Sequence, residues 1–361
     1  MKDVGIGIVG AGFVADIHAE SIQRHVRGAR VTAVAAPTPG HANAFAERHG
    51  VELVFKDYRQ LVEHTAVDAV LIACPNDLHR DVTVAAAAAG KHVICEKPLC
   101  RTLDEADEMI TACHREGVLL CYAEELCFAP KYVRMKQLVD EGAIGQVYLI
   151  KQSEKHDGPH APWFWDVTRS GGGVTLDMGC HALQFFRWLL DGAAAESVYA
   201  DMGTFVHGAR TAGDDNSIVL TRFAGGVQTI AEESWAKPGG MDDRAEIYGS
   251  EGVIYADLLH GNALECYSRN GYGYAVEKAE TSQGWTFAIF EEAWNYGFPQ
   301  EIQHFADCIY HGRPPLCSGR DGRAVLELLY AAYASAGSGR RVELPFTPTA
   351  DTCHGEWQRG Q

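Results

Sequence analysis

The chain begins with the glycine pattern that most constrains its fold. The segment VGIGIVGAGFVADIHAESI places Gly10, Gly12 and Ala15 in G-x-G-x-x-A spacing, after a strand-like run and before a helical pattern. Glycines here allow a tight turn and close approach of a pyrophosphate, whose charge a helix N-terminus stabilises. We predict a dinucleotide-binding loop that includes Gly10, Gly12, Phe13 and Val14. The alternative is a glycine turn that serves only helix packing.

The first 125 residues predict a parallel sheet. Short β-branched runs alternate with amphipathic segments, which is typical of βαβ units. We therefore expect a Rossmann domain over residues 1–125. The expected strands are Val4–Val9, Ala29–Ala35, Ala69–Cys74, His92–Cys95 and Val118–Tyr122.

Residues 126–361 have a different pattern. Several segments alternate strand, glycine-containing turn and strand, and the Asn270-Gly271 pair is a strong hairpin signal. We predict an α+β domain with a large, mostly antiparallel open sheet. Its expected helices are Gly179–Leu190, Gln300–Tyr310 and Arg323–Ala336.

Charge and composition narrow the classes of partner. The 361 residues, 47% of them apolar and 22% charged, are enough for two globular domains. A formal net charge of -17 would repel phosphate backbones and anionic lipids, so we expect neither a nucleic-acid nor a membrane partner. No basic leader precedes the first strand, and the cysteines are scattered singly, as in a reducing compartment. We expect a cytoplasmic protein.

The end of the second strand leaves the choice of nicotinamide cofactor open. An NAD site usually offers an acidic side chain to the adenosine ribose there, yet the segment TAVAAPTPGHA has Ala36 at that place. No arginine follows to bind a 2′-phosphate. Ala36 and Thr38 are the predicted cofactor contacts, and His41 is a further polar candidate. We expect NAD, with NADP possible.

Several further motifs together resemble the Gfo/Idh/MocA oxidoreductases, the family of glucose-fructose oxidoreductase and inositol dehydrogenase. The resemblance covers nearly the whole length. It is carried by Gly10 to Ala15, Pro75-Asn76 with His79, Glu96-Lys97-Pro98, Asp177 with Gly179 and His181, and the segment GRPPLCSGRDGRAVLELLYAAYASAGSGRRVELP. The resemblance implies that further cofactor contacts come from Cys74, Pro75, Asn76, His79, Glu96 and Lys97.

The resemblance implies that Lys97 faces the nicotinamide and the substrate, with a cis Lys97-Pro98 peptide. Ligands bind at the carboxyl edge of parallel strands, and Pro98 restricts the loop that carries the ammonium there. A positive charge at this place stabilises an alkoxide that develops on a sugar hydroxyl. The alternative is a solvated lysine at the end of a strand.

Asp177 and His181 are the other two catalytic residues that the resemblance implies. They are four residues apart, so on one helix the carboxylate could orient the imidazole. An oriented neutral histidine can accept the hydroxyl proton while hydride leaves the carbon. The alternatives are a helix N-cap for Asp177 and a buried, hydrogen-bonded ring for His181. Gln184 departs from the aspartate that many relatives carry.

The segments YAEELCF and KQSEKHDGPHAPWFWDV are the least generic in the chain. Aromatic rings together with carboxylates and imidazoles suit a saccharide. The predicted substrate residues are Glu124, Glu125, His156, His160, Trp163 and Trp165. Two alternatives remain: Trp163 and Trp165 pack an interface or a loop core, or His156 and His160 bind a divalent metal. We expect no metal.

These observations predict a nicotinamide-dependent dehydrogenase that oxidises a secondary ring hydroxyl of a sugar, cyclitol or glycoside. The resemblance also implies a homodimer or homotetramer. A glycosidase that uses tightly bound NAD for transient oxidation is the first alternative, and a dinucleotide-sensing regulator without activity is the second. The presence of Lys97, Asp177 and His181 argues against a pure sensor.

Overall fold

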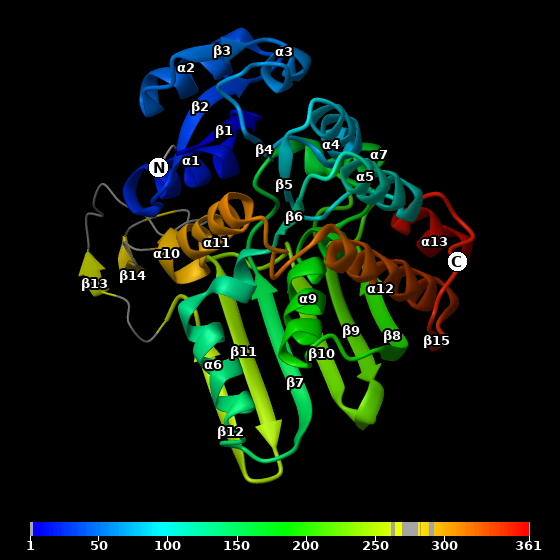
Figure 1. Cartoon of the computed structure of the whole chain (residues 1–361). Helices are drawn as coiled ribbons and strands as arrows, with labels where there is room; N and C mark the ends of the chain where they lie inside the picture. Colours follow the sequence, from blue (N-terminus) through cyan, green and yellow to red (C-terminus); the bar gives the residue numbers. More distant parts are fainter. Residues whose placement is uncertain (1–2, 261–263, 269–280, 282, 289–291, 361) are drawn as a thin grey trace. The chain divides into compact units, whose positions relative to one another are not determined.

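The computed structural model describes residues 3–260, 264–268, 281, 283–288 and 292–360, which divide into two compact units (Figure 1). The first unit contains Met1–Phe128 and Gly297–Leu326, and the second contains Ala129–Tyr296 and Glu327–Gln361. None of the helices within these described ranges combines the length and hydropathy needed to span a bilayer.

The first unit is built on a parallel sheet of six strands in the order β3-β2-β1-β4-β5-β6. Its two central strands β1 and β4 are buried along their whole length, as expected for a sheet covered on both faces. The expected Rossmann fold is confirmed. The strands are β1 (Val4–Val9), β2 (Ala29–Ala35), β3 (Leu53–Phe55), β4 (Ala69–Ile72), β5 (His92–Glu96) and β6 (Leu120–Ala123).

Helices connect these strands and begin where the sequence supplies capping groups. In α5, Thr102 is the N-cap and accepts the Glu105 N–H at 3.0 Å, and Gly117 adopts a left-handed φ of 67° just beyond the helix. The helical segments of this part are α1 (Phe13–His25), α2 (Pro39–His49), α3 (Tyr58–Val62), η1 (Asn76–Leu78), α4 (His79–Ala88), α5 (Leu103–Arg115) and η2 (Glu125–Phe128).

The unit boundaries differ from the expected division at residue 125, because the chain returns to the first unit. Helix α11 (Phe298–His311) packs on α1, β1 and η2. Beyond it, the Tyr122 N–H donates to the Cys317 carbonyl at 3.0 Å, and Ser318 forms a bridge with Cys121. The third expected helix is α12 (Gly319–Ser338), whose last residues belong to the second unit.

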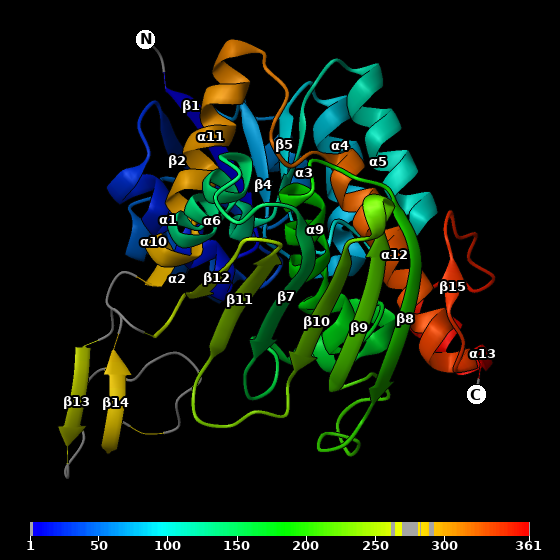
Figure 2. The same cartoon turned by 90° about the horizontal axis from the view of Figure 1, so that it is seen from below.

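The second unit contains a sheet of seven strands in the order β12-β11-β7-β10-β9-β8-β15 (Figure 2). Neighbouring strands are antiparallel except β7 and β10, which are parallel. The expected mostly antiparallel sheet is confirmed. Its strands are β7 (Val147–Lys155), β8 (Ala195–Gly203), β9 (Asn216–Phe223), β10 (Gln228–Ser234), β11 (Asp242–Gly249), β12 (Gly252–Asp257) and β15 (Val342–Glu343).

Helices of this unit cover one face of the sheet, with α9 packed on β7 and β10 and α6 packed on β12. On β9, buried and exposed residues alternate, as expected for a sheet with one open face. The helical segments are α6 (Pro130–Asp140), η3 (Pro162–Trp165), α7 (Val167–Ser170), α8 (Val174–Asp177), α9 (Gly179–Leu189), η4 (Ala224–Gly226), α10 (Glu292–Tyr296) and α13 (Cys353–Gly360).

A separate two-stranded sheet pairs β13 (Leu264–Ser268) with β14 (Gly284–Ala288) in antiparallel register. The predicted hairpin turn at Asn270-Gly271 lies outside the described residues.

Candidate active site

The glycine loop between β1 and α1 has the geometry of a phosphate cradle. Gly10 has a φ of 118°, and a Cβ there would lie 2.0 Å from the Ala73 carbonyl oxygen, so the turn requires glycine. Gly12 is the N-cap of α1, has no side-chain cap, and a Cβ on it would meet nothing within 4 Å. The first N–H groups of α1 thus border an open space that suits a pyrophosphate. Phe13, 46% exposed, and Val14 follow directly.

The loop after β2 carries the predicted adenosine contacts. Ala36 is buried, and its N–H donates to the Phe55 carbonyl at 3.2 Å. Thr38 is the N-cap of α2, and its carbonyl accepts the His41 N–H at 3.0 Å. The Ala36 hydrogen bond holds the backbone of the loop against the end of β3. Position 36, where many NAD sites carry an acidic residue, is an alanine.

The sheet order places four loops along one edge. Strands β1, β4, β5 and β6 are consecutive neighbours and parallel, so their carboxyl ends lie at the same edge. Four predicted site segments follow these strands: the glycine loop, Cys74-Pro75-Asn76, Lys97, and Glu124-Glu125. This edge is where doubly wound sheets bind their ligands.

Two hydrogen bonds of the Glu96 carboxylate hold the chain on the N-terminal side of Lys97, one of them buried and the other partly buried. Oε2 of Glu96 accepts the Lys97 N–H at 3.1 Å, and Oε1 lies 2.5 Å from Nε2 of His18 on α1. Burial raises the pKa of Glu96, but its hydrogen bond with His18 and the charges of His18 and Lys97 outweigh burial and lower the pKa. Glu96 is therefore a carboxylate. The Lys97-Pro98 peptide is cis.

His79 fixes the other side of the same loop. Its Nδ1 lies 3.1 Å from the Pro98 carbonyl oxygen and 3.2 Å from that of Leu99, and Nε2 lies 2.9 Å from the Cys74 carbonyl oxygen. The ring is fully buried, and burial lowers the pKa of His79. The imidazole therefore connects the loops after β4 and β5 through backbone carbonyls. Asn76, in the short η1 helix that Pro75 precedes, is also buried.

Buried carboxyl groups follow β6. Glu124 and Glu125 are almost completely inaccessible to solvent. Burial raises the pKa of Glu124 to about 8, against the opposing charge of Lys97. Burial and the charge of Glu125 likewise raise the pKa of Glu301 on α11, and neither carboxyl oxygen of Glu301 has a hydrogen-bond partner within the described residues. At neutral pH, Glu124 is therefore largely protonated, and burial favours the protonated form of Glu301 as well.

In the second unit, Asp177 and His181 lie on two successive short helices instead of one. Asp177 ends α8 and His181 belongs to the first turn of α9, with Met178 between the helices. Oδ2 of Asp177 accepts the indole N–H of Trp235 at 3.2 Å. Both catalytic candidates are buried, as is Gln184 one turn beyond His181. Trp235 is a partner of Asp177 that the sequence analysis did not identify.

A buried aspartate fixes the start of α8. Asp214 accepts the backbone N–H groups of Gly173 and Thr175, at 3.1 and 2.8 Å, and the hydroxyl group of Tyr333 at 2.6 Å. A Cβ on Gly173 would lie 2.1 Å from the Asp214 carbonyl oxygen, so this close contact requires glycine. The GGG run that precedes α8 thus lets Asp214 hold the helix that ends at Asp177.

Trp165 contacts Trp235 directly, and Trp163 is connected to Trp235 through Phe164. Trp165 packs edge-to-face on Trp235 with ring centroids 5.4 Å apart, and the Arg210 guanidinium lies 4.2 Å from the Trp165 ring. Trp163 stacks on Phe164 at 3.8 Å. Trp165 therefore supports the tryptophan that contacts Asp177, which agrees with the loop-core alternative for this residue.

His156 and His160 are neighbours in space as well as in sequence. Their rings are edge-to-face with centroids 4.9 Å apart; His156 is buried and His160 is exposed. The backbone N–H of His156 donates to the backbone carbonyl of Ser234 at 2.9 Å, which joins the end of β7 to the end of β10. The pair thus lies next to the chain that continues into Trp235.

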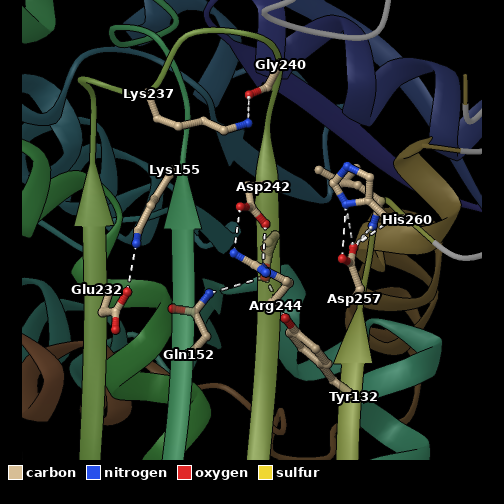
Figure 3. Close-up of polar contacts among 12 residues, drawn as sticks. Tyr132, Gln152, Lys155, Glu232, Lys237, Gly240, Asp242, Arg244, Asp257 and His260 are labelled. Carbon is tan, nitrogen blue, oxygen red and sulfur yellow. Dashed lines mark hydrogen bonds and ion pairs between the residues drawn. The ribbon is translucent and has the colours of Figure 1, made fainter. Parts of the chain in front are cut away.

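A row of three acids crosses the helix-covered face of the second sheet. Glu154 on β7 is in register with Glu233 on β10 and with Asp243 on β11, and all three are buried. Burial raises the pKa of Asp243 to about 7 and also raises the pKa of Glu233 well above its usual range. Figure 3 shows Tyr132 and Gln152, which donate to Oδ1 of Asp243 at 2.5 and 3.3 Å. Burial therefore favours the protonated forms of Asp243 and Glu233 in this row. Surface pairs such as Lys155 with Glu232 lie nearby (Figure 3).

Comparisons with known proteins identify the family. Residues 4–124 match the model of the oxidoreductase family with an NAD-binding Rossmann fold, and residues 132–255 match the GFO/IDH/MocA C-terminal domain. The chain belongs to this family. The predicted resemblance is therefore confirmed, and with it the expectation of a nicotinamide-dependent oxidoreductase.

Relatives and solved structures cover nearly the whole chain. A myo-inositol 2-dehydrogenase of Thermotoga maritima is 30% identical over 341 residues, which cover 94% of this chain and 98% of the relative. A scyllo-inositol 2-dehydrogenase (NAD(+)) of Bacillus subtilis is 28% identical, with 94% and 96% covered. The structure of GenD2 from gentamicin A biosynthesis, in complex with NAD, superposes with a TM-score of 0.90 at 31% identity and covers 96% of this chain and 97% of that one.

Several site residues were missed in the sequence. His18, Trp235 and Asp214 each contact a predicted site element from a distant part of the chain. The signal for His18 was present, because it lies six residues after Gly12 in the helix that begins at the glycine loop. Trp235 and Asp214 had no comparable local pattern.

Proposed function

We propose that this protein is an NAD-dependent dehydrogenase that oxidises a secondary ring hydroxyl of a cyclitol, sugar or glycoside to a ketone, reversibly. The observation that carries the proposal is the single sheet edge where the open cradle at Gly12 follows β1 and the Lys97 loop follows β5, two parallel strands separated only by β4. The inositol dehydrogenases named above support the substrate class.

Different residues of this chain bind the cofactor, stabilise the developing charge and accept the proton. The N-terminus of α1 and the backbone at Gly10 and Gly12 bind the pyrophosphate of NAD, and bound NAD supplies the hydride acceptor. The Lys97 ammonium stabilises the negative charge that develops on the substrate oxygen. His181 accepts the hydroxyl proton, while Asp177, held by Trp235, orients the imidazole. Lys97, Asp177 and His181 are therefore the proposed catalytic residues.

The remaining candidate residues complete the proposed binding sites. Ala36, Thr38, Asn76 and the loop that His79 fixes border the cofactor. NAD is favoured over NADP because nothing at Ala36 offers a positive charge to a 2′-phosphate. The proposed substrate residues are Glu124, Glu125, His156, His160 and Trp163, with Trp165 acting through Trp235.

We also propose a cytoplasmic homo-oligomer. The open face of the second sheet exposes large apolar side chains, including Tyr255 at 66%, Ile218 at 46% and Val253 at 43%. A face of this kind suits contact with a second copy of the chain. The side chains of the described cysteines form no disulfide, which supports a reducing compartment.

The test is a screen of inositols, monosaccharides and glycosides with NAD and NADP in parallel, followed by the absorbance of the reduced cofactor. A dehydrogenase accumulates reduced cofactor in proportion to ketone. Release of free sugar without net reduction would instead support a glycosidase. His181→Ala should lower turnover at least about 100-fold and keep NAD binding, while His311→Ala, at the end of α11, should behave as wild type. Unchanged turnover of His181→Ala would refute the role of His181.

A further inference from the structure

We infer that His18 is a positioning residue for Lys97, acting through the carboxylate of Glu96. This inference rests on the proposed function of Lys97. His18 lies on α1, the helix that begins at the glycine loop, and it is 78 residues before Glu96 in the sequence.

His18 and Glu96 form a short, buried contact. Nε2 of His18 and Oε1 of Glu96 are 2.5 Å apart, and the exposed fractions of the two residues are 0% and 5%. The ring of Phe298 packs edge-to-face on the imidazole with centroids 5.4 Å apart, which restricts its orientation. A hydrogen bond this short to a buried charged group is of the strong, charge-assisted kind.

His18 is the donor in its hydrogen bond with Glu96. Glu96 is ionised, as the lowering of its pKa indicates, so its carboxylate accepts and Nε2 of His18 donates. The other carboxylate oxygen accepts the Lys97 N–H at 3.1 Å. Glu96 therefore connects the His18 ring to the backbone of Lys97 through its two oxygens, and loss of the His18 donor would release one of them.

Several buried carboxyl groups determine the charge around Lys97. Glu96 and Glu124 act electrostatically on each other and on Lys97, and Glu125 and Glu301 belong to the same group of buried carboxyls. Burial keeps Glu124 largely protonated at neutral pH and favours the protonated form of Glu301, whereas the hydrogen bond from His18 favours the ionised form of Glu96. Glu96 is thus a negative charge that favours the ammonium form of Lys97, and His18 is the donor that preserves this charge.

Two substitutions separate positioning from packing. His18→Leu fills the space beside Phe298 with an apolar side chain and removes the N–H group that donates to Glu96. His18→Gln retains an N–H donor. We expect His18→Leu to lower kcat about 10- to 100-fold, as for a displaced catalytic group, while the Kd of NADH measured by fluorescence changes less than about threefold. His18→Gln should recover most of the activity, and His25→Gln, at the end of the same helix, should be indistinguishable from wild type.

A second readout does not depend on turnover. Competitive labelling with acetic anhydride, followed by mass spectrometry, reports how readily each lysine exists as the free amine. Loss of the Glu96 charge should increase labelling of Lys97 at least about threefold, because a fall of half a unit in lysine pKa triples the free amine. Labelling of Lys91, at the other end of β5, should not change. Glu96→Gln should give the same increase as His18→Leu.

The double variant gives the decisive result. If His18 acts through Glu96, adding His18→Leu to Glu96→Gln produces no further loss of kcat and no further labelling. Additive losses, wild-type labelling of Lys97 in His18→Leu, or loss of NADH binding together with kcat would each overturn the inference. A wild-type protein that oxidises no ring alcohol would refute the proposed function alone, since the labelling comparison would still decide the role of His18.

Discussion

The indole N–H of Trp235 donates to Oδ2 of Asp177 at 3.2 Å, deep inside the second unit. The two residues come from the end of β10 and the end of α8, and Trp165 packs against the indole from the side. A carboxylate with one oxygen held by a rigid ring has a restricted orientation. This contact therefore restricts the orientation of the Asp177 carboxylate, which we propose acts on His181.

Replacing Trp235 by phenylalanine should separate orientation from packing. Trp235→Phe keeps an aromatic ring against Trp165 but removes the donor to Asp177. We expect a destabilisation of about 1–3 kcal/mol, since the buried Asp177 carboxylate loses the indole donor, and a fall in kcat of about 10- to 100-fold with the NADH affinity retained. Thermal unfolding and steady-state kinetics measure these effects. Trp188→Phe on α9 is the matched control, and equal losses of kcat in both variants would contradict the prediction.

The cradle at Gly12 predicts a selective effect on cofactor binding. Gly12→Ala places a methyl group in space where the protein has no atom within 4 Å, so the fold should tolerate it. The methyl group would meet the bound pyrophosphate, and we expect NADH affinity to fall at least about 10-fold, or 1.4 kcal/mol. Fluorescence titration of NADH gives the affinity. Gly208→Ala, in a loop of the second unit, should leave it unchanged; wild-type affinity in Gly12→Ala would place the pyrophosphate elsewhere.

Asp243 should make the protein less stable as the pH rises toward neutrality. Its pKa is raised to about 7 in the folded state, so between the unfolded pKa of about 3.9 and this value the folded state binds the extra proton. The free energy of unfolding therefore falls with rising pH across this window, by up to about 1.4 kcal/mol per pH unit, and is level above it.

Urea unfolding at a series of pH values tests this. Asp243→Asn keeps an acceptor for Tyr132 and cannot ionise, so its stability should depend less on pH between about 4 and 7. Asp242→Asn, at the neighbouring position that pairs with Arg244, should keep the wild-type slope. An unchanged slope in Asp243→Asn would show that other groups cause the dependence.

Glu124 should give the reaction a limb in its pH profile. Its pKa is raised to about 8, so below this pH the protonated carboxyl can donate a hydrogen bond to a substrate oxygen, and above it the carboxylate cannot. We expect kcat/KM to decline above about pH 8. Glu124→Gln retains donors at all pH values and should remove that decline. Profiles from about pH 6.5 to 9.5 measure it, with Glu47→Gln on the exposed face of α2 as control; an identical decline in Glu124→Gln would exclude this role.

The local features of the fold were predictable because their causes lie within a few residues. The turn at Gly10 and Gly12, the capping of α5 by Thr102 and Gly117, and the hairpins from β9 to β12 follow from steric and hydrogen-bonding rules over short distances. The identities of Lys97, Asp177 and His181 as candidates came from the family resemblance, which the whole-chain comparisons confirm at the level of the family.

The sequence by itself determined the kinds of secondary structure, the glycine cradle and the family, since each depends on local pattern. The tertiary structure decided which distant side chains meet: His18 with Glu96 across 78 residues, Trp235 with Asp177 across 58, and the acids of β7, β10 and β11 in one buried row. It also decided that α11 packs with the first unit. The physical reason is that strand order, register and the partners of buried polar groups are fixed by the packing of the entire chain, and packing leaves no local signature.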